Sequence, residues 1–69
     1  MTRLLEERKA LGLRQSEVAE QVGVHRTTYL TYEQGRRPPI TVALRLSRLF
    51  SKPLEYLFPD PADAEADVR

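Results

Sequence analysis

The strongest constraint on the fold is Gly23, which separates two short helical patterns. The segment before it, from about residue 15 to 22, places three apolar side chains on one face at helical spacing. A glycine at this point permits a left-handed backbone that a residue with a side chain resists. A second helical pattern follows at about residues 26–34 and stops at Gly35. The sequence therefore predicts two short helices joined by a turn of three or four residues.

Three further helices are expected around this pair, and no segment alternates as a strand would. One runs from about residue 3 to 11, with Thr2 as its N-cap. The others cover about residues 40–51 and, after a proline suited to a first helical turn, 54–58. One face of the first helix carries Leu4, Leu5, Arg8 and Leu11. The inner positions expected in the last two are Ile40, Ala43, Leu44, Leu46, Ser47, Phe50, Leu54, Leu57 and Phe58.

Length and composition exclude several classes of protein. The 69 residues allow one small domain at most. Because there is no cysteine and only one histidine, we expect no disulfide, no metal site and no cofactor. No apolar run approaches the ~18 residues needed to cross a bilayer. We therefore expect a soluble cytoplasmic protein without a membrane partner.

The charges are unevenly distributed along the chain. Residues 1–58 carry ten basic and six acidic side chains, a net charge of +4. Residues 59–69 carry four acids and one arginine, a net charge of −3, and almost no large apolar side chain. We expect a folded domain over residues 1–58 and a disordered acidic tail over 59–69. A mildly basic domain is compatible with a nucleic-acid partner.

Residues 11–38 read LGLRQSEVAEQVGVHRTTYLTYEQGRRP, and two short helices around a glycine-containing turn are the sequence form of a helix-turn-helix. This stretch resembles the Cro and phage-repressor type of helix-turn-helix, the XRE family of bacterial and phage regulators. Residues 39–58 look like the last two helices of that family. The resemblance implies an all-α fold, a compact five-helix bundle. The matching positions are Leu11, Gly12, Leu13, Gln15, Glu17, Val18, Ala19, Gly23, Val24, Tyr29, Tyr32, Glu33 and Gly35.

The same resemblance implies a DNA-binding site with two kinds of contact. In the family the third helix enters the major groove and the second lies across the DNA backbone. Base edges are expected to meet Arg26, Thr27 and Thr31. The positions expected to contact the phosphate backbone are Gln15, Thr28, Arg36 and Arg37.

The spacing of the third helix divides its residues in the same way. Tyr29, Tyr32 and Glu33 stand at i, i+3 and i+4 and share one face, which we expect to be buried. Arg26 lies on the remaining arc, and a guanidinium suits the two acceptors of guanine. Such a contact contributes about 1–3 kcal/mol of discrimination between bases. Leu30 lies at the edge of that arc, where we favour partial burial over contact with a thymine methyl.

Two positions depart from the family pattern. Arg14 and His25 stand where the family usually has a Ser, Thr or Asn cap, and losing a good cap costs on the order of 1 kcal/mol. Both side chains can reach a phosphate, so we add them to the expected backbone contacts. The resemblance also implies that Arg8 forms a structural ion pair with Glu33.

These observations predict a sequence-specific regulator that binds double-stranded DNA in a bacterial or phage context. We expect a homodimeric repressor of a palindromic operator, since one short helix reads few base pairs. We expect no small-molecule ligand. Tyr56 and Leu57 of the fifth helix are the expected dimer contacts. The alternative is a protein-interaction module, such as an antitoxin that binds a partner protein. An enzyme is disfavoured because the sequence offers no nucleophile–base pair and no phosphate-cradling loop.

Overall fold

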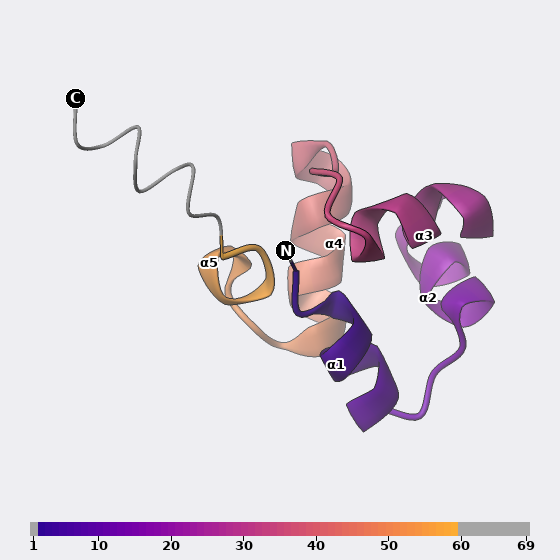
Figure 1. The fold of residues 1–69 in the computed structure, drawn as a ribbon, viewed down its shortest axis with the longest axis horizontal. Helices are drawn as coiled ribbons and strands as arrows, with labels where there is room; N and C mark the ends of the chain where they lie inside the picture. The colour runs from indigo at the N-terminus through magenta and orange to yellow at the C-terminus, as the bar shows by residue number, and fades with distance from the viewer. Residues whose placement is uncertain (1, 60–69) are drawn as a thin grey trace.

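The computed structural model describes residues 2–59, and every regular element in that range is a helix (Figure 1). The helix bounds differ from the predicted ones by at most one residue at either end. The all-α, five-helix fold class predicted from the sequence is therefore confirmed. The helices are α1 (Leu4–Ala10), α2 (Gln15–Val22), α3 (Arg26–Glu33), α4 (Ile40–Phe50) and α5 (Leu54–Leu57).

A single core draws side chains from all five helices. The largest side chains in it are almost completely shielded from solvent. Burying an aliphatic side chain of this size contributes about 1.5–3 kcal/mol, so each helix is held mainly by what it places in this cluster. In chain order the fully buried side chains are Leu4, Val18, Val22, Tyr29, Leu46 and Leu57.

The inner face of α4 matches the prediction at Ala43, Leu46 and Phe50, which are buried, and differs from it at two positions. Ile40 is 65% exposed and Leu44 is 43% exposed, whereas Val42 is buried with Leu46. Ile40 and Leu44 each stand two residues before a buried position, which is roughly 200° around a helix. The helix therefore carries apolar side chains on two opposite faces, and only one of them packs on the core. Likewise, Leu4 of α1 is buried, while Leu5 of the same helix and Leu11, which follows it, are exposed.

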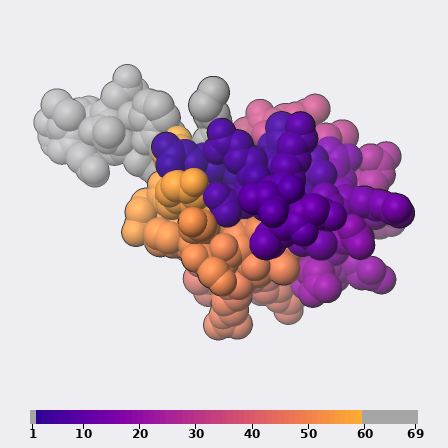
Figure 2. All heavy atoms as spheres, turned by 90° about the horizontal axis from the view of Figure 1, so that it is seen from below, coloured from indigo at the N-terminus to yellow at the C-terminus, as the bar shows by residue number. Residues whose placement is uncertain are grey.

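The start of the described chain packs against its end. The backbone N–H of Arg3 donates to the carbonyl of Leu57 at 2.9 Å. Figure 2 shows the N-terminal residues lying against the segment that follows α4. Thr2 is not the N-cap of α1, contrary to prediction, because Arg3 holds that position. The Thr2 hydroxyl instead donates to the carbonyl of Glu33 at 3.4 Å, at the end of α3.

Tyr56 fastens α5 to α1 from the outside. Its hydroxyl donates to Glu7 Oε2 at 3.1 Å. Its ring lies 4.5 Å from the guanidinium carbon of Arg3 and 5.2 Å from Lys52 Nζ, within cation–π range. Leu57 is fully buried, as its predicted inner position requires, so it is not available as an exposed dimer contact. The expectation of a dimer contact at Leu57 was wrong, because Leu57 is the side chain through which α5 enters the core.

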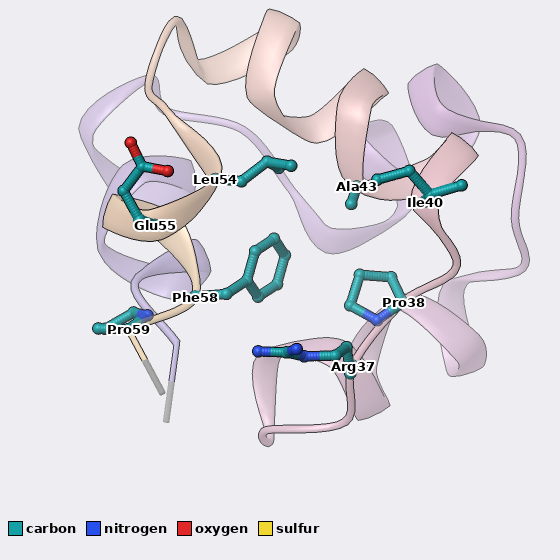
Figure 3. A pocket seen from close by; sticks show the side chains of 8 residues that line it. All are labelled: Arg37, Pro38, Ile40, Ala43, Leu54, Glu55, Phe58 and Pro59. Carbon is teal, nitrogen blue, oxygen red and sulfur yellow. The ribbon is translucent and has the colours of Figure 1, made fainter. Parts of the chain in front are cut away.

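A pocket of about 550 Å³ lies between α4 and α5 (Figure 3). Leu54 and Phe58 face Ala43 and Pro38 across it, and Arg37 and Glu55 stand at its rim. Ser51, which follows α4, has a positive φ of 56° and turns the chain toward α5. The complete lining is Arg37, Pro38, Ile40, Ala43, Leu54, Glu55, Phe58 and Pro59.

Three expectations concern membrane-spanning helices, metal sites and the acidic tail. Within residues 2–59, none of the helices has the length and apolar composition that crossing a bilayer requires. In the same range no three His, Cys, Asp or Glu side chains are grouped to hold a metal ion. The expected acidic tail, residues 59–69, lies outside the described residues apart from Pro59.

Candidate nucleic-acid interface

The turn between α2 and α3 is built on Gly23. Its φ of 78° and ψ of 31° place it in the left-handed region, where a side chain is disfavoured. Its N–H donates to the carbonyl of Glu20, and the N–H of Val24 donates to that of Ala19 at 2.9 Å. These bonds satisfy carbonyls that the end of α2 leaves without helical partners. The turn thereby sets the direction in which α3 leaves α2.

Arg45 of α4 supports this turn from outside the two helices. Its Nη1 donates to the carbonyl of Val22 at 3.3 Å. A Cβ added at Gly23 would lie only 2.8 Å from the same nitrogen. A cation at the C-terminal end of α2 also meets the negative end of the helix dipole. From the sequence alone Arg45 reads as a solvated residue of the outer face, because nothing in its local pattern points to residues 22–23.

The two faces of α3 are separated as the spacing predicts. Tyr29 and Tyr32 are buried in the core, and the Glu33 side chain is 6% exposed. Arg26 and Thr27 are exposed at the start of the helix, whereas Leu30 is half-buried. The predicted inward face is confirmed. The outward arc presents the polar side chains of Arg26 and Thr27 to solvent, while Tyr29 and Tyr32 anchor the helix in the core.

Arg8 and Glu33 lie together between α1 and α3. Arg8 Nε is 2.6 Å from Glu33 Oε2, with side chains only 13% and 6% exposed. Arg8 Nη1 also donates to the carbonyl of Leu13 at 2.9 Å. Burial pulls the pKa of Glu33 upward, but hydrogen bonds, led by that of Arg8, outweigh it, and the pKa falls below its ordinary value. Glu33 is therefore ionised at neutral pH.

The amide of Gln15 connects this ion pair to the surface. Its Nε2 donates to Glu33 Oε1 at 3.2 Å, and its Oε1 accepts from Arg26 Nη1 at 3.1 Å. Gln15 begins α2 and Arg26 begins α3, so the bond draws the N-terminal ends of the two helices together. Sequence reasoning placed both residues at the candidate site without linking them.

Neither N-cap residue of the two helices caps with its side chain. Arg14 and His25 both have extended backbones and exposed side chains, and neither side chain accepts a cap hydrogen bond. In α2 the Glu17 carboxylate accepts from the N–H of Arg14 at 2.7 Å, which is one half of a capping box. No such acid stands in the first turn of α3. The start of α3 thus keeps the N–H groups and positive dipole that favour a phosphate.

Comparison with protein families identifies this arrangement. A family model described as helix-turn-helix matches residues 4–57, which include all five helices. The chain belongs to the XRE-type helix-turn-helix family. Proteins of this family are DNA-binding transcriptional regulators rather than enzymes.

Curated relatives agree with the family assignment. An uncharacterized HTH-type transcriptional regulator of Archaeoglobus fulgidus is 38% identical over 58 residues, covering 83% of this chain and 83% of the relative. One of Methanothermobacter thermautotrophicus is 44% identical over 52 residues, covering 74% of this chain and 75% of the relative. No solved structure matched the chain significantly.

The other candidate contacts of this helix-turn-helix protein lie along and beyond α3. Thr31 is half-buried, and its hydroxyl donates to the carbonyl of Thr28 at 2.6 Å. The hydroxyl proton of Thr31 is therefore already used within the helix. Arg36 and Arg37 are exposed in the segment after α3, at the opposite end of that helix from Arg26. An eight-residue helix spans about 12 Å, so the two ends would meet different parts of a DNA ligand.

Proposed function

We propose that this helix-turn-helix regulator is a homodimeric repressor that reads a palindromic operator through the major groove with α3. The observation that carries the proposal is Arg26, an exposed guanidinium at the start of α3, held by Gln15 beside a helix end that no side chain caps. A cation aimed outward from a helix N-terminus suits a site where guanine acceptors lie next to phosphates.

Base reading is assigned to the outward arc of α3. Arg26 would donate to guanine O6 and N7, since a guanidinium retains several N–H groups after bonding to Gln15. Thr27 is exposed on the same turn. Thr31 would offer its methyl group to thymine or its lone pairs to a base amine, because its proton is already used within the helix.

Phosphate contacts would set the register of α3 in the groove. They come from both ends of the helix and from the start of α2, so the phosphates contacted would flank the bases that are read. Contacts of this kind contribute affinity that falls steeply with salt. The residues assigned to this role are Arg14, Gln15, His25, Thr28, Arg36 and Arg37.

The dimeric state follows from the reach of one helix. Dimers of this kind of motif bind half-sites about one helical turn apart, which gives a palindromic operator. A DNA-binding regulator works where the genome is, so we place its action at the nucleoid in the cytoplasm.

The test is selection from random duplex DNA with the wild-type chain and with Arg26→Ala. Arg48→Ala is the matched control, since Arg48 is an exposed arginine on α4 outside the proposed interface. We expect a palindromic site, with base preference lost at one position in each half-site only for Arg26→Ala. Binding with a steep salt slope but no sequence preference would contradict the proposal. Failure to bind DNA would favour the protein-interaction alternative.

The dimer is tested separately by analytical ultracentrifugation, with and without a selected duplex. We expect two protein monomers bound to each duplex. One monomer per selected site would overturn the homodimer part of the proposal and leave the DNA-reading part standing.

A further inference from the structure

Glu33 uses its two carboxylate oxygens for different partners. Oε2 accepts from Arg8 inside the domain, and Oε1 accepts from the side-chain amide of Gln15. An ionised carboxylate offers acceptors only, so the NH2 end of the Gln15 amide is the end that faces it. Glu33 therefore determines which way round the amide stands.

The orientation of that amide has a consequence at the surface. With Nε2 turned toward Glu33, the opposite atom, Oε1, is directed at Arg26 and accepts from its Nη1 at 3.1 Å. Position 15 thus presents an acceptor to position 26, which a guanidinium satisfies. Glu33, whose side chain is 6% exposed, is in this way connected by two hydrogen bonds to Arg26 on the protein surface.

We propose that Glu33 is a positioning residue for DNA recognition, which acts through Gln15 to hold Arg26 in its reading orientation before DNA arrives. The proposal rests on the proposed function, because it takes Arg26 as a residue that reads a base. Holding a flexible side chain in place beforehand lowers the entropy lost on binding. It also restricts the guanidinium to one geometry against the base, and so sharpens discrimination at that position.

The first experiment uses the free protein. NMR relaxation of the Arg26 Nε–Hε group measures how ordered the guanidinium is without any DNA. Gln15→Met removes both hydrogen bonds but keeps a long, helix-favouring side chain. Gln21→Met is the matched control, an exposed glutamine of the same helix. We expect the Arg26 order parameter to fall by about a third in Gln15→Met and to stay unchanged in Gln21→Met. An ordered Arg26 in Gln15→Met would overturn the proposal.

A second variant isolates Glu33 from any phosphate contact of Gln15. In Arg8→Met/Glu33→Met the ion pair is replaced by apolar side chains, a kind of exchange that folded proteins often tolerate. Gln15 and Arg26 remain, yet Arg26 is expected to lose order as it does in Gln15→Met. Unchanged order of Arg26 in a folded double variant would refute the role of Glu33. Should that variant unfold, Arg8→Met/Glu33→Gln replaces it, because the neutral amide at position 33 can face Gln15 with either its donor or its acceptor end and no longer fixes the orientation of Gln15.

The DNA experiment compares a selected duplex with one altered at the base read by Arg26. Gln15→Met is expected to lower the affinity ratio of the two duplexes about 3- to 10-fold. In an Arg26→Ala background the same substitution should leave the ratio unchanged. An equal loss of affinity for both duplexes would mean that Gln15 contacts phosphate only. If Arg26→Ala changes no base preference, Arg26 does not read a base and that part of the proposed function is wrong. The NMR experiment still measures whether Gln15 and Glu33 order Arg26 in the free protein.

Discussion

Arg8 and Glu33 form an ion pair of 2.6 Å between Nε and Oε2 that joins α1 to the last residue of α3. Because both side chains are nearly buried, neither can exchange its partner for water at low cost. The pair therefore fixes the position of α3, and with it the outward arc, relative to α1.

Removing one member of this pair strands the other. Glu33→Ala should lower the free energy of unfolding by about 3–5 kcal/mol, because Arg8 is left charged and poorly solvated. In a domain of this size that corresponds to a drop in Tm of more than about 10 °C by circular dichroism. The control Arg8→Met/Glu33→Met should recover most of the loss. An unchanged Tm in Glu33→Ala would show that the pair contributes no stability.

The same carboxylate makes stability depend on pH in the acid range. The pKa of Glu33 is lower in the folded protein than its ordinary value of 4.5, so the unfolded chain takes up the proton first as pH falls. Its contribution is complete above about pH 4.5 and is lost below that, as pH falls through the folded pKa. Urea denaturation at a series of pH values should show a steeper acid loss in the wild type than in Arg8→Met/Glu33→Met. Parallel curves would contradict this.

Two glycines with similar backbones provide an internal comparison. Gly12 and Gly23 have φ values of 70° and 78°, so alanine pays a left-handed backbone penalty of about 1–2 kcal/mol at each. Only at Gly23 does the new Cβ also displace Arg45 from the end of α2. We expect Gly23→Ala to cost about 1 kcal/mol more than Gly12→Ala in chemical denaturation. In an Arg45→Ala background the two alanine substitutions should cost the same free energy of unfolding. A larger cost for Gly23→Ala in that background would mean that a contact other than Arg45 is responsible.

Arg14→Ser should change stability and DNA affinity in opposite directions. A serine can cap α2 and complete the capping box with Glu17, which raises stability by about 1 kcal/mol. It also removes a proposed phosphate contact, so the slope of log affinity against log salt should decrease by about one. Thermal unfolding and titrations at several salt concentrations measure the two effects. Higher stability with an unchanged salt slope would leave Arg14 without a role on DNA.

The helix bounds could be predicted because glycines and prolines punctuate strong 3.6-residue patterns. The inner face of α4 could be predicted only in part. Ala43, Leu46 and Phe50 are buried as expected, but Ile40 and Leu44 were expected there too and are exposed, while Val42 was missed. Local periodicity does not say which stripe α2 and α5 will cover. Tertiary packing makes that choice, and it buries Val42 rather than Ile40.

The candidate site was predictable to a similar degree. Its residue types and their spacing on α3 follow from helical geometry and from the family pattern. The link from Gln15 to Arg26 and the bond from Arg45 to Val22 join positions 11 and 23 residues apart. Such bonds depend on how helices cross, which no local pattern encodes.

The bond between Arg3 N–H and the carbonyl of Leu57 also bears on how the chain could be rewired. It makes the path from residue 3 to residue 57 a nearly closed ring. A short linker between residues 2 and 59 would allow a circular permutant with new termini in the exposed 35–37 segment. The same closure means that trimming either end loosens both, so α1 and α5 should exchange their amide hydrogens together as one unit.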